Sequence, residues 1–418
     1  MIPQKEKIFK LYFFIVAFVN LGSATMMQMF NSTIALHIDA LDYTASVSGT
    51  IISIGAVSAT IYRFFGGKLC EKRGRRQLIM IGLADFAVMS FLIGQVTSLA
   101  LIYVLRVLQM FGYSMASTSV SVAVVDVIPP KRVGEGLGYY SLAASIPQAF
   151  GPSVALFLYH TKGGFVTVMA GTAMVGLISL LLTFLFLDYE KKWSGGSDTG
   201  ASKAPVPGGQ NTKGALEPPR RETGIWRYIE KHALPAAWIY FFVSISGSLV
   251  TMYLTLYASK TGIANAGLFF TISVIFMIAA RIASGRLSDR RGVLSAVVPG
   301  TAVLILGYIL LIFSGRVHLL FYVAGACYGF GTGMSAPALN AQAVKGVRKE
   351  RVSIASSTFF LPMDLSFMAG SVLWGVMIDH FSFVVVFMTA AVLSLAAMFL
   401  SVILFSPGRC YNRRNKAQ

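Results

Sequence analysis

Long apolar runs constrain this chain more than any other feature of its sequence. Twelve of them are long enough, at roughly 20 residues each, to cross the hydrocarbon core of a bilayer as a helix. Lipid cannot satisfy the backbone groups of an open strand, so the runs predict helices. They cover about residues 11–32, 45–66, 78–97, 101–127, 134–159, 165–187, 234–257, 264–285, 293–313, 318–342, 352–376 and 382–405. The sequence therefore predicts an all-α membrane protein with twelve transmembrane helices.

The basic residues are unevenly divided between the predicted loops. The net charge is +18, and 29 of the 35 lysines and arginines fall on one side of the twelve helices, whereas three fall on the other. Lysine and arginine are retained in cytoplasmic loops, so we expect a multi-pass plasma-membrane protein with both termini in the cytoplasm. The charge reports topology and does not indicate a nucleic-acid partner. The run after Lys10 is too long for a signal peptide and predicts an uncleaved first helix.

A polar segment separates the sixth run from the seventh. Residues 188–233 contain a stretch rich in Gly, Pro, Ser and Lys, which is typical of a linker that does not build a core. We therefore expect an N-terminal six-helix bundle in 1–187, a cytoplasmic linker in 188–233, and a C-terminal six-helix bundle with a short basic tail in 234–418. Parallel six-helix repeats are a transporter architecture in which the substrate site lies between the repeats.

Short motifs recur in the two predicted bundles. "GGKLCEKRGRR" at 66–76 aligns with "SGRLSDRRG" at 284–292, so that Gly67 corresponds to Gly285. "MFGYSM" at 110–115 aligns with "GFGTGM" at 329–334, so that Gly112 corresponds to Gly331. The repeats predict that the two bundles are pseudo-symmetric.

The charged repeats resemble a loop motif of the major facilitator superfamily, and the resemblance covers nearly the whole chain. The family motif reads G-x-L-x-D-R-x-G-R; residues 285–292 fit it closely, whereas the first copy has Glu71 and Lys72 in place of Asp and Arg. The resemblance implies alternating access, with the loops as a conformational latch. A solvated basic loop that topology retains is the alternative. The expected latch residues are Gly67, Glu71, Arg75, Asp126, Gly285, Asp289, Arg290 and Gly292.

Two further motifs bear on the direction of transport. The stretch from Arg106 through Gln109 is similar to the family's R-x-x-Q-G-x-G motif, which is linked there to proton coupling, although Met110 replaces a glycine. Helix five resembles the G-x-x-x-G-P-x-x-G motif of drug–proton antiporters. The matching positions there are Pro147, which replaces a glycine, and Gly151 and Pro152. The resemblance implies proton-coupled export.

A narrower similarity concerns the cargo. Residues 140–152 and 264–281 resemble exporters of staphylopine-type opine metallophores, which carry a small, carboxylate-rich chelator out of the cell. The stretches are short and also occur in relatives with other cargo. The cargo is therefore expected to be an opine metallophore or a drug.

Ionisable residues inside the apolar runs cost about 2.5–3.5 kcal/mol each on insertion scales, so each calls for an explanation. Asp364 lies about 18 Å beyond Val352 at the helical rise, close to the middle of the bilayer. We assign it and Arg106 to proton coupling; a neutral, hydrogen-bonded structural carboxyl is the alternative. Arg63 and Arg281 lie one helical turn before the repeated loop glycines and predict a clamp for a carboxylate-bearing cargo, or alternatively a brace for the latch.

Other polar residues are candidates for the substrate site, although each of them could also serve in packing. They are Asn31, Gln109, Tyr113, Gln148 and Tyr253. The chain has no G-x-x-x-x-G-K-[ST] motif, which argues against an ATP-binding domain. We also find no nucleophile–base pair and no metal-ligand spacing, so we predict neither an enzyme nor a cofactor or metal site.

The sequence thus predicts a monomeric, proton-coupled secondary exporter of a small organic molecule that works by alternating access in the lipid bilayer. Two alternatives remain at this point. One is a proton-coupled importer of a small metabolite, and the other is a non-transporting membrane sensor on the same fold.

Overall fold

The computed structural model describes residues 11–128, 140, 145–186, 229–347 and 351–405, without the side chains at 64–68, 70–72, 125, 126, 289, 352, 353, 356 and 357. The described part contains twelve helices: α1 (Leu11–Ala40), α2 (Ala45–Arg73), α3 (Arg75–Gln95), α4 (Leu99–Val127), α6 (Ile146–Tyr159), α7 (Gly164–Phe186), α9 (Leu234–Lys260), α10 (Gly267–Arg291), α11 (Leu294–Phe313), α12 (Leu319–Val344), α13 (Val352–His380) and α14 (Phe383–Phe405). The predicted all-α class is confirmed.

Ten of the described helices are long and apolar enough to span a membrane. The other two are α6, of which 14 residues are described, and the glycine-rich α12. The predicted run at 134–159 lies partly outside the described residues, which explains the short α6. The chain is therefore a multi-pass membrane protein.

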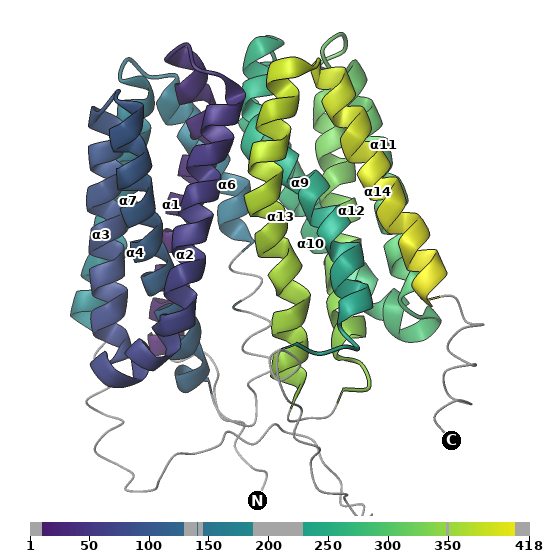
Figure 1. The fold of residues 1–418 in the computed structure, drawn as a ribbon, viewed down its shortest axis with the longest axis horizontal. Helices are drawn as coiled ribbons and strands as arrows, with labels where there is room; N and C mark the ends of the chain where they lie inside the picture. The colour runs from purple at the N-terminus through teal and green to yellow at the C-terminus, as the bar shows by residue number, and fades with distance from the viewer. Residues whose placement is uncertain (1–10, 129–139, 141–144, 187–228, 348–350, 406–418) are drawn as a thin grey trace, which may run out of the picture.

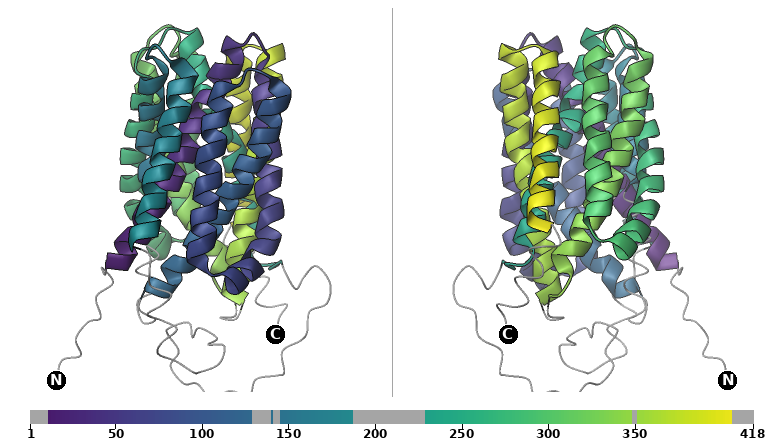
Figure 2. Two further views of the ribbon diagram at one scale, coloured as in Figure 1. Left: turned by 90° about the vertical axis from the view of Figure 1, so that its left-hand side faces the viewer. Right: turned by 90° about the vertical axis from the view of Figure 1, so that its right-hand side faces the viewer.

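The helices form two bundles that lie side by side (Figure 1). Helices α1 to α7 make the N-terminal bundle and α9 to α14 make the C-terminal bundle, and they meet through α2 against α13, α6 against α10 and α1 against α9. The start of α1 and the end of α14 lie at the same end of the molecule, which we call the terminal end (Figure 2). The opposite end is called the distal end. The predicted boundary segment 188–233 lies mostly outside the described residues.

The repeated loop motif forms the same turn in both bundles. Gly74 follows α2 with a φ of 80°, and Gly292 follows α10 with a φ of 85°. An L-residue with a side chain rarely adopts these dihedral angles, so glycine is required at both turns. The aligned glycines of the two charged motifs thus occupy equivalent turns at the terminal end of their bundles.

At the distal end the two bundles touch backbone to backbone. A Cβ atom added to Gly49 of α2 would lie 2.1 Å from the Ser371 carbonyl oxygen of α13. A Cβ at Gly267 of α10 would lie 2.7 Å from Cα of Ser153 in α6. Small residues permit such close approach of membrane helices. The distal ends of the two bundles are therefore closed against each other in this conformation.

Polar contacts accompany this closure. The Asp379 carboxylate of α13 accepts hydrogen bonds from the backbone N–H groups of Ala45 and Ser46, with distances of 2.6 and 2.9 Å. These groups lie at the N-terminus of α2, where the helix dipole favours a negative charge. Lys260 Nζ lies 2.9 Å from Asp39 Oδ1 and links α9 to α1 at the same end.

Candidate substrate cavity and its charged contacts

A cavity of about 430 Å³ lies between the two bundles. Helices α1, α4 and α6 line it from one bundle, and α9, α10, α12 and α13 line it from the other. We call it the central cavity. Its polar lining consists of Asn20, Gln28, Tyr113, Gln148, Tyr240, Ser244, Thr251, Ser273, Arg281, Tyr328 and Thr332. Arg281, Tyr113 and Gln148 are among the residues that the sequence assigns to the substrate site.

Arg281 reaches across the interface between the bundles. Its Nη1 donates a hydrogen bond to the hydroxyl oxygen of Ser145, at 2.9 Å. Ser145 is the residue before α6, and its hydroxyl does not cap that helix. The Nε atom of Arg281 is buried without a hydrogen-bond partner among the described residues. The guanidinium group therefore keeps unused donor capacity beside the central cavity.

Arg63 also reaches across the interface, and it ends on a carboxylate. Its Nη1 lies 2.7 Å from Oδ2 of Asp364, so α2 is joined to α13 by an ion pair. The two side chains are 45% and 41% exposed, so the pair is not sealed inside the protein. Asp364 was predicted to be a water-facing acid with a role in proton coupling, and that role stays a prediction. In this conformation Arg63 is occupied by Asp364 and does not converge with Arg281 on a common ligand.

Arg106 lies inside the N-terminal bundle and does not line the central cavity. It is fully buried, its Nη1 donates to Gln109 Oε1 at 2.5 Å, and its guanidinium carbon stacks 3.8 Å from the centre of the Phe30 ring. Gln109 in turn donates to the hydroxyl of Ser90. No described carboxylate forms an ion pair with Arg106. A proton-coupling role for Arg106 stays a prediction, as does a substrate role for Gln109.

Two other predicted substrate residues also lie away from the cavity. Asn31 is buried in α1. Tyr253 lies in the distal interface, where its hydroxyl donates to the Ser371 carbonyl at 2.6 Å and is 3.2 Å from the Ala45 carbonyl. Tyr253 therefore holds the bundles together in this conformation. Its role in binding cargo stays a prediction.

The antiporter-like motif positions α6. Pro147 lies in the first turn of the helix and lines the central cavity. A Cβ at Gly151 would lie 2.7 Å from Cβ of Gln28, so this glycine lets α6 pack closely on α1. Pro152 is buried within α6. The motif thus determines how one wall of the cavity is placed.

The predicted latch is described only in part. The side chains at Glu71, Asp126 and Asp289 lie outside the described residues, as does any contact of Gly67. Arg75 begins α3, and Arg290 is exposed in the last turn of α10. No described atom lies within 4 Å of a Cβ added to Gly285, so this glycine does not form a close helix contact in this conformation. The latch stays a prediction.

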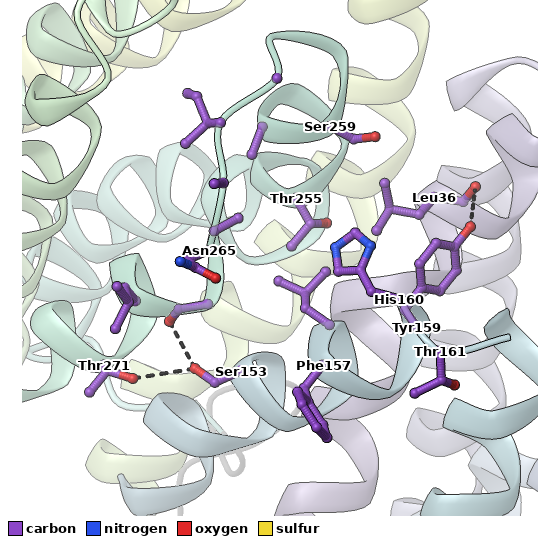
Figure 3. Close-up of a pocket in the computed structure, with 18 of the residues that line it drawn as sticks. Leu36, Ser153, Phe157, Tyr159, His160, Thr161, Thr255, Ser259, Asn265 and Thr271 are labelled. Atoms are coloured by element: carbon purple, nitrogen blue, oxygen red, sulfur yellow. Dashed lines mark hydrogen bonds between the residues drawn. The ribbon is translucent and has the colours of Figure 1, made fainter. Parts of the chain in front are cut away.

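A larger hollow of about 1030 Å³ lies at the distal end, between α6 and the segment that joins α9 to α10 (Figure 3). Ser153 donates to the Gly267 carbonyl at 2.8 Å and lies 3.3 Å from the Thr271 hydroxyl. Its lining has no Asp, Glu, Lys or Arg among the described residues, and Phe157 on its rim is 74% exposed. Both hollows lie between the bundles, but among the described lining residues only the central cavity holds an arginine, so it is the better candidate for the substrate site.

Sequence reasoning did not identify two residues at the interface. One of them is Ser145. It corresponds to Asp364 in the alignment that pairs Gly112 with Gly331, so the internal repeat points from Asp364 to Ser145. Asp379 caps α2 across the interface. Asp379 lies three residues beyond the predicted run at 352–376, and an acid in that place gives no indication of such a distant partner.

Comparisons with known proteins agree with this architecture. The model of the Major Facilitator Superfamily matches residues 14–361 and, in a second match, residues 264–417. The chain therefore belongs to the Major Facilitator Superfamily, and it is a transporter of small molecules and not an enzyme.

Individual relatives are more distant. The staphylopine export protein of Staphylococcus aureus (strain Mu50) is 24% identical over 367 residues, which cover 86% of this chain and 88% of the relative. The quinolone resistance protein NorA of the same species is 24% identical over 189 residues, or 45% of this chain and 47% of the relative. The solved structure of a D-xylose–proton symporter matches with a TM-score of 0.70 at 13% identity, covering 93% of this chain and 96% of that one. The expected resemblance to exporters of this family is confirmed.

Proposed function

We propose that this transporter is a proton-coupled secondary exporter of a small organic molecule. The observation that carries the proposal is the Arg63–Asp364 ion pair, which joins the two bundles and is only half buried. Protonation of Asp364 removes its negative charge and with it the attraction to Arg63. A proton can thus bias the equilibrium between two arrangements of the bundles, which is what coupling requires.

Export is favoured over import by the similarity to an export protein and to a drug-resistance protein. The cargo is expected to be an opine metallophore or a drug. Structural similarity to a D-xylose–proton symporter supports the shared fold and does not indicate direction. Import of a small metabolite is therefore the alternative that the experiment must distinguish from export.

The direction is tested by flux in proteoliposomes that contain the purified protein. A proton gradient imposed in either direction should drive a quinolone or an opine chelator against its own gradient and opposite to proton flow. Movement of cargo together with protons would indicate an importer, and no gradient-dependent flux of any tested cargo would contradict proton coupling.

Orientation in the plasma membrane is a second part of the proposal, based on the lysine and arginine asymmetry. Single cysteines at Asp42 and Lys260, both at the distal end, should react in intact cells with thiol reagents that do not cross membranes. A cysteine at Gly209 in the linker segment should react only after the membrane is opened. Labelling of Gly209 in intact cells would contradict cytoplasmic termini.

A further inference from the structure

The two arginine contacts between the bundles are related by the internal repeat. Arg63 corresponds to Arg281 in the alignment of the charged loops, and their partners correspond in the alignment that pairs Gly112 with Gly331. Those partners are Asp364 for Arg63 and Ser145 for Arg281. Each arginine therefore reaches from its own bundle to the equivalent position of the other bundle. The two contacts occupy equivalent positions in the repeat, but one arginine meets a carboxylate and the other meets a neutral hydroxyl.

The difference leaves Arg281 without a counter-charge among the described residues. Asp364 neutralises Arg63, whereas the described partner of Arg281 is the neutral hydroxyl of Ser145. No described carboxylate forms an ion pair with Arg281. Arg281 is also the one Asp, Glu, Lys or Arg side chain among the described residues that line the central cavity. The described lining of the cavity therefore carries one positive charge and no negative charge.

One edge of the Arg281 guanidinium group has no hydrogen-bond partner among the described residues. The contact with Ser145 uses Nη1, and Nε is buried without a described partner. Nη2 also makes no hydrogen bond to a described residue, so the edge formed by Nε and Nη2 is unused. Two parallel N–H groups on that edge match the two oxygens of a carboxylate.

We propose that Arg281 is an anion-binding residue of the central cavity and that the cargo carries a carboxylate, which binds the unpaired Nε–Nη2 edge once the side chain turns towards the cavity. The inference rests on the proposed small-molecule transport and narrows its substrate class. Neutral donors in the same cavity, including Tyr113, Tyr240 and Gln148, are available for the uncharged part of the cargo. A cargo whose only charge is positive is disfavoured beside an unpaired guanidinium.

The experiment measures equilibrium binding to the purified full-length protein in detergent. The probes are two acid–ester pairs: nalidixic acid with its methyl ester, and N-benzoyl-glutamate with its dimethyl ester. Each ester keeps the shape of its acid and removes the negative charge. The ester also reports whether a variant is still folded and able to bind.

The principal variant is Ser145→Asp, which gives Arg281 the same kind of partner that Arg63 has. Its matched control is Ser145→Asn, which has nearly the same size and no charge. Arg281→Lys keeps the charge and removes the two-pronged edge.

We expect the unmodified protein to bind at least one acid about tenfold more tightly than its ester, as a charge-assisted bidentate contact provides. Ser145→Asp and Arg281→Lys should each reduce this preference at least about fivefold, whereas Ser145→Asn should retain it. Equal binding of acid and ester by the unmodified protein, no binding of either acid, or an unchanged preference in Ser145→Asp would overturn the proposal.

Failure of the proposed function would look different. If the acid preference is present and depends on Arg281, but no proton gradient drives flux, the anion site stands and proton-coupled export does not. If gradient-driven efflux of a neutral or cationic compound occurs without any acid preference, export stands and the anion site does not.

Discussion

The two ends of the interface between the bundles are held together by different means. At the distal end, backbone meets backbone at Gly49 and Gly267. Towards the terminal end, the contacts are long arginine side chains on Asp364 and Ser145, and the first of these is only half buried. Close packing responds little to pH or cargo, whereas a charged contact responds to both. This difference is consistent with the proposal that protons and cargo act on the arginine contacts.

The largest effect is expected from a large side chain in the distal contact. In Gly49→Leu the new Cβ would lie 2.1 Å from the Ser371 carbonyl oxygen, so α2 and α13 cannot keep their present separation. Transport should fall to background. Spin labels at Tyr43 and Ala264, in the distal loops of the two bundles, should move apart.

The matched control for this change is Gly285→Leu, because no described atom lies within 4 Å of a Cβ added at Gly285. The distance between the distal labels should then be unchanged. A Gly49→Leu protein that transports normally would show that backbone contact at the distal end is not required.

The next largest effect concerns the charged contact. Asp364→Asn removes the proton-accepting group and the attraction to Arg63. Uphill, gradient-driven transport should fall more than about tenfold, as expected for loss of the coupling residue, whereas exchange of cargo between the two sides should persist. Flux in proteoliposomes, measured with and without a proton gradient, distinguishes uphill transport from exchange. Asp364→Glu, which keeps a carboxylate, should recover part of the coupled flux; full coupled flux in Asp364→Asn would exclude this residue as the coupling site.

A smaller effect is expected for the repeated loop at the terminal end. If the loop is a latch, Asp289→Asn weakens its charged hydrogen bonds, and transport should fall several-fold at normal abundance in the membrane. Asp42→Asn in a distal loop is the control and should have little effect. Unchanged transport in Asp289→Asn would favour a solvated basic loop.

The smallest effect is expected for Asp379, which caps α2 across the distal interface. Asparagine at this position keeps an acceptor oxygen and loses the charge, which is worth about 0.3–1 kcal/mol at a helix N-terminus. Asp379→Asn should therefore change the population of the closed distal end by about two- to fivefold, measured with the same distal labels. A complete loss of closure would mean that polar contacts, and not backbone packing, hold this end.

The helices and the turns between them could be predicted from the sequence, because an apolar run of a given length has few alternatives in lipid. The predicted run at 101–127, for example, ends where α4 ends. The orientation of side chains was harder to predict. Most helices are apolar on all sides, so no polar stripe indicates which face meets the cavity.

Individual residues illustrate this limit. Gln109 and Tyr113 are one helical turn apart in α4, yet Gln109 is directed to Arg106 within the bundle and Tyr113 lines the cavity. The ion pair of Arg63 with Asp364 joins residues 301 positions apart and depends on how the bundles dock. The internal repeat pairs Ser145 with Asp364, but the sequence does not show that Asp364 contacts an arginine of the other bundle. Ser145 therefore gave no sign of contacting Arg281.

The most direct test of the account follows the terminal end as a function of pH. Spin labels at Gln77 in α3 and Lys345 next to α12 lie on different bundles and report the separation of the terminal ends. When the pH falls, protonation of Asp364 weakens its attraction to Arg63, so the unmodified protein should shift towards larger distances. Asp364→Asn should show the larger distances at every pH. A distance distribution that does not change with pH in the unmodified protein, or that changes equally in Asp364→Asn, would contradict the account.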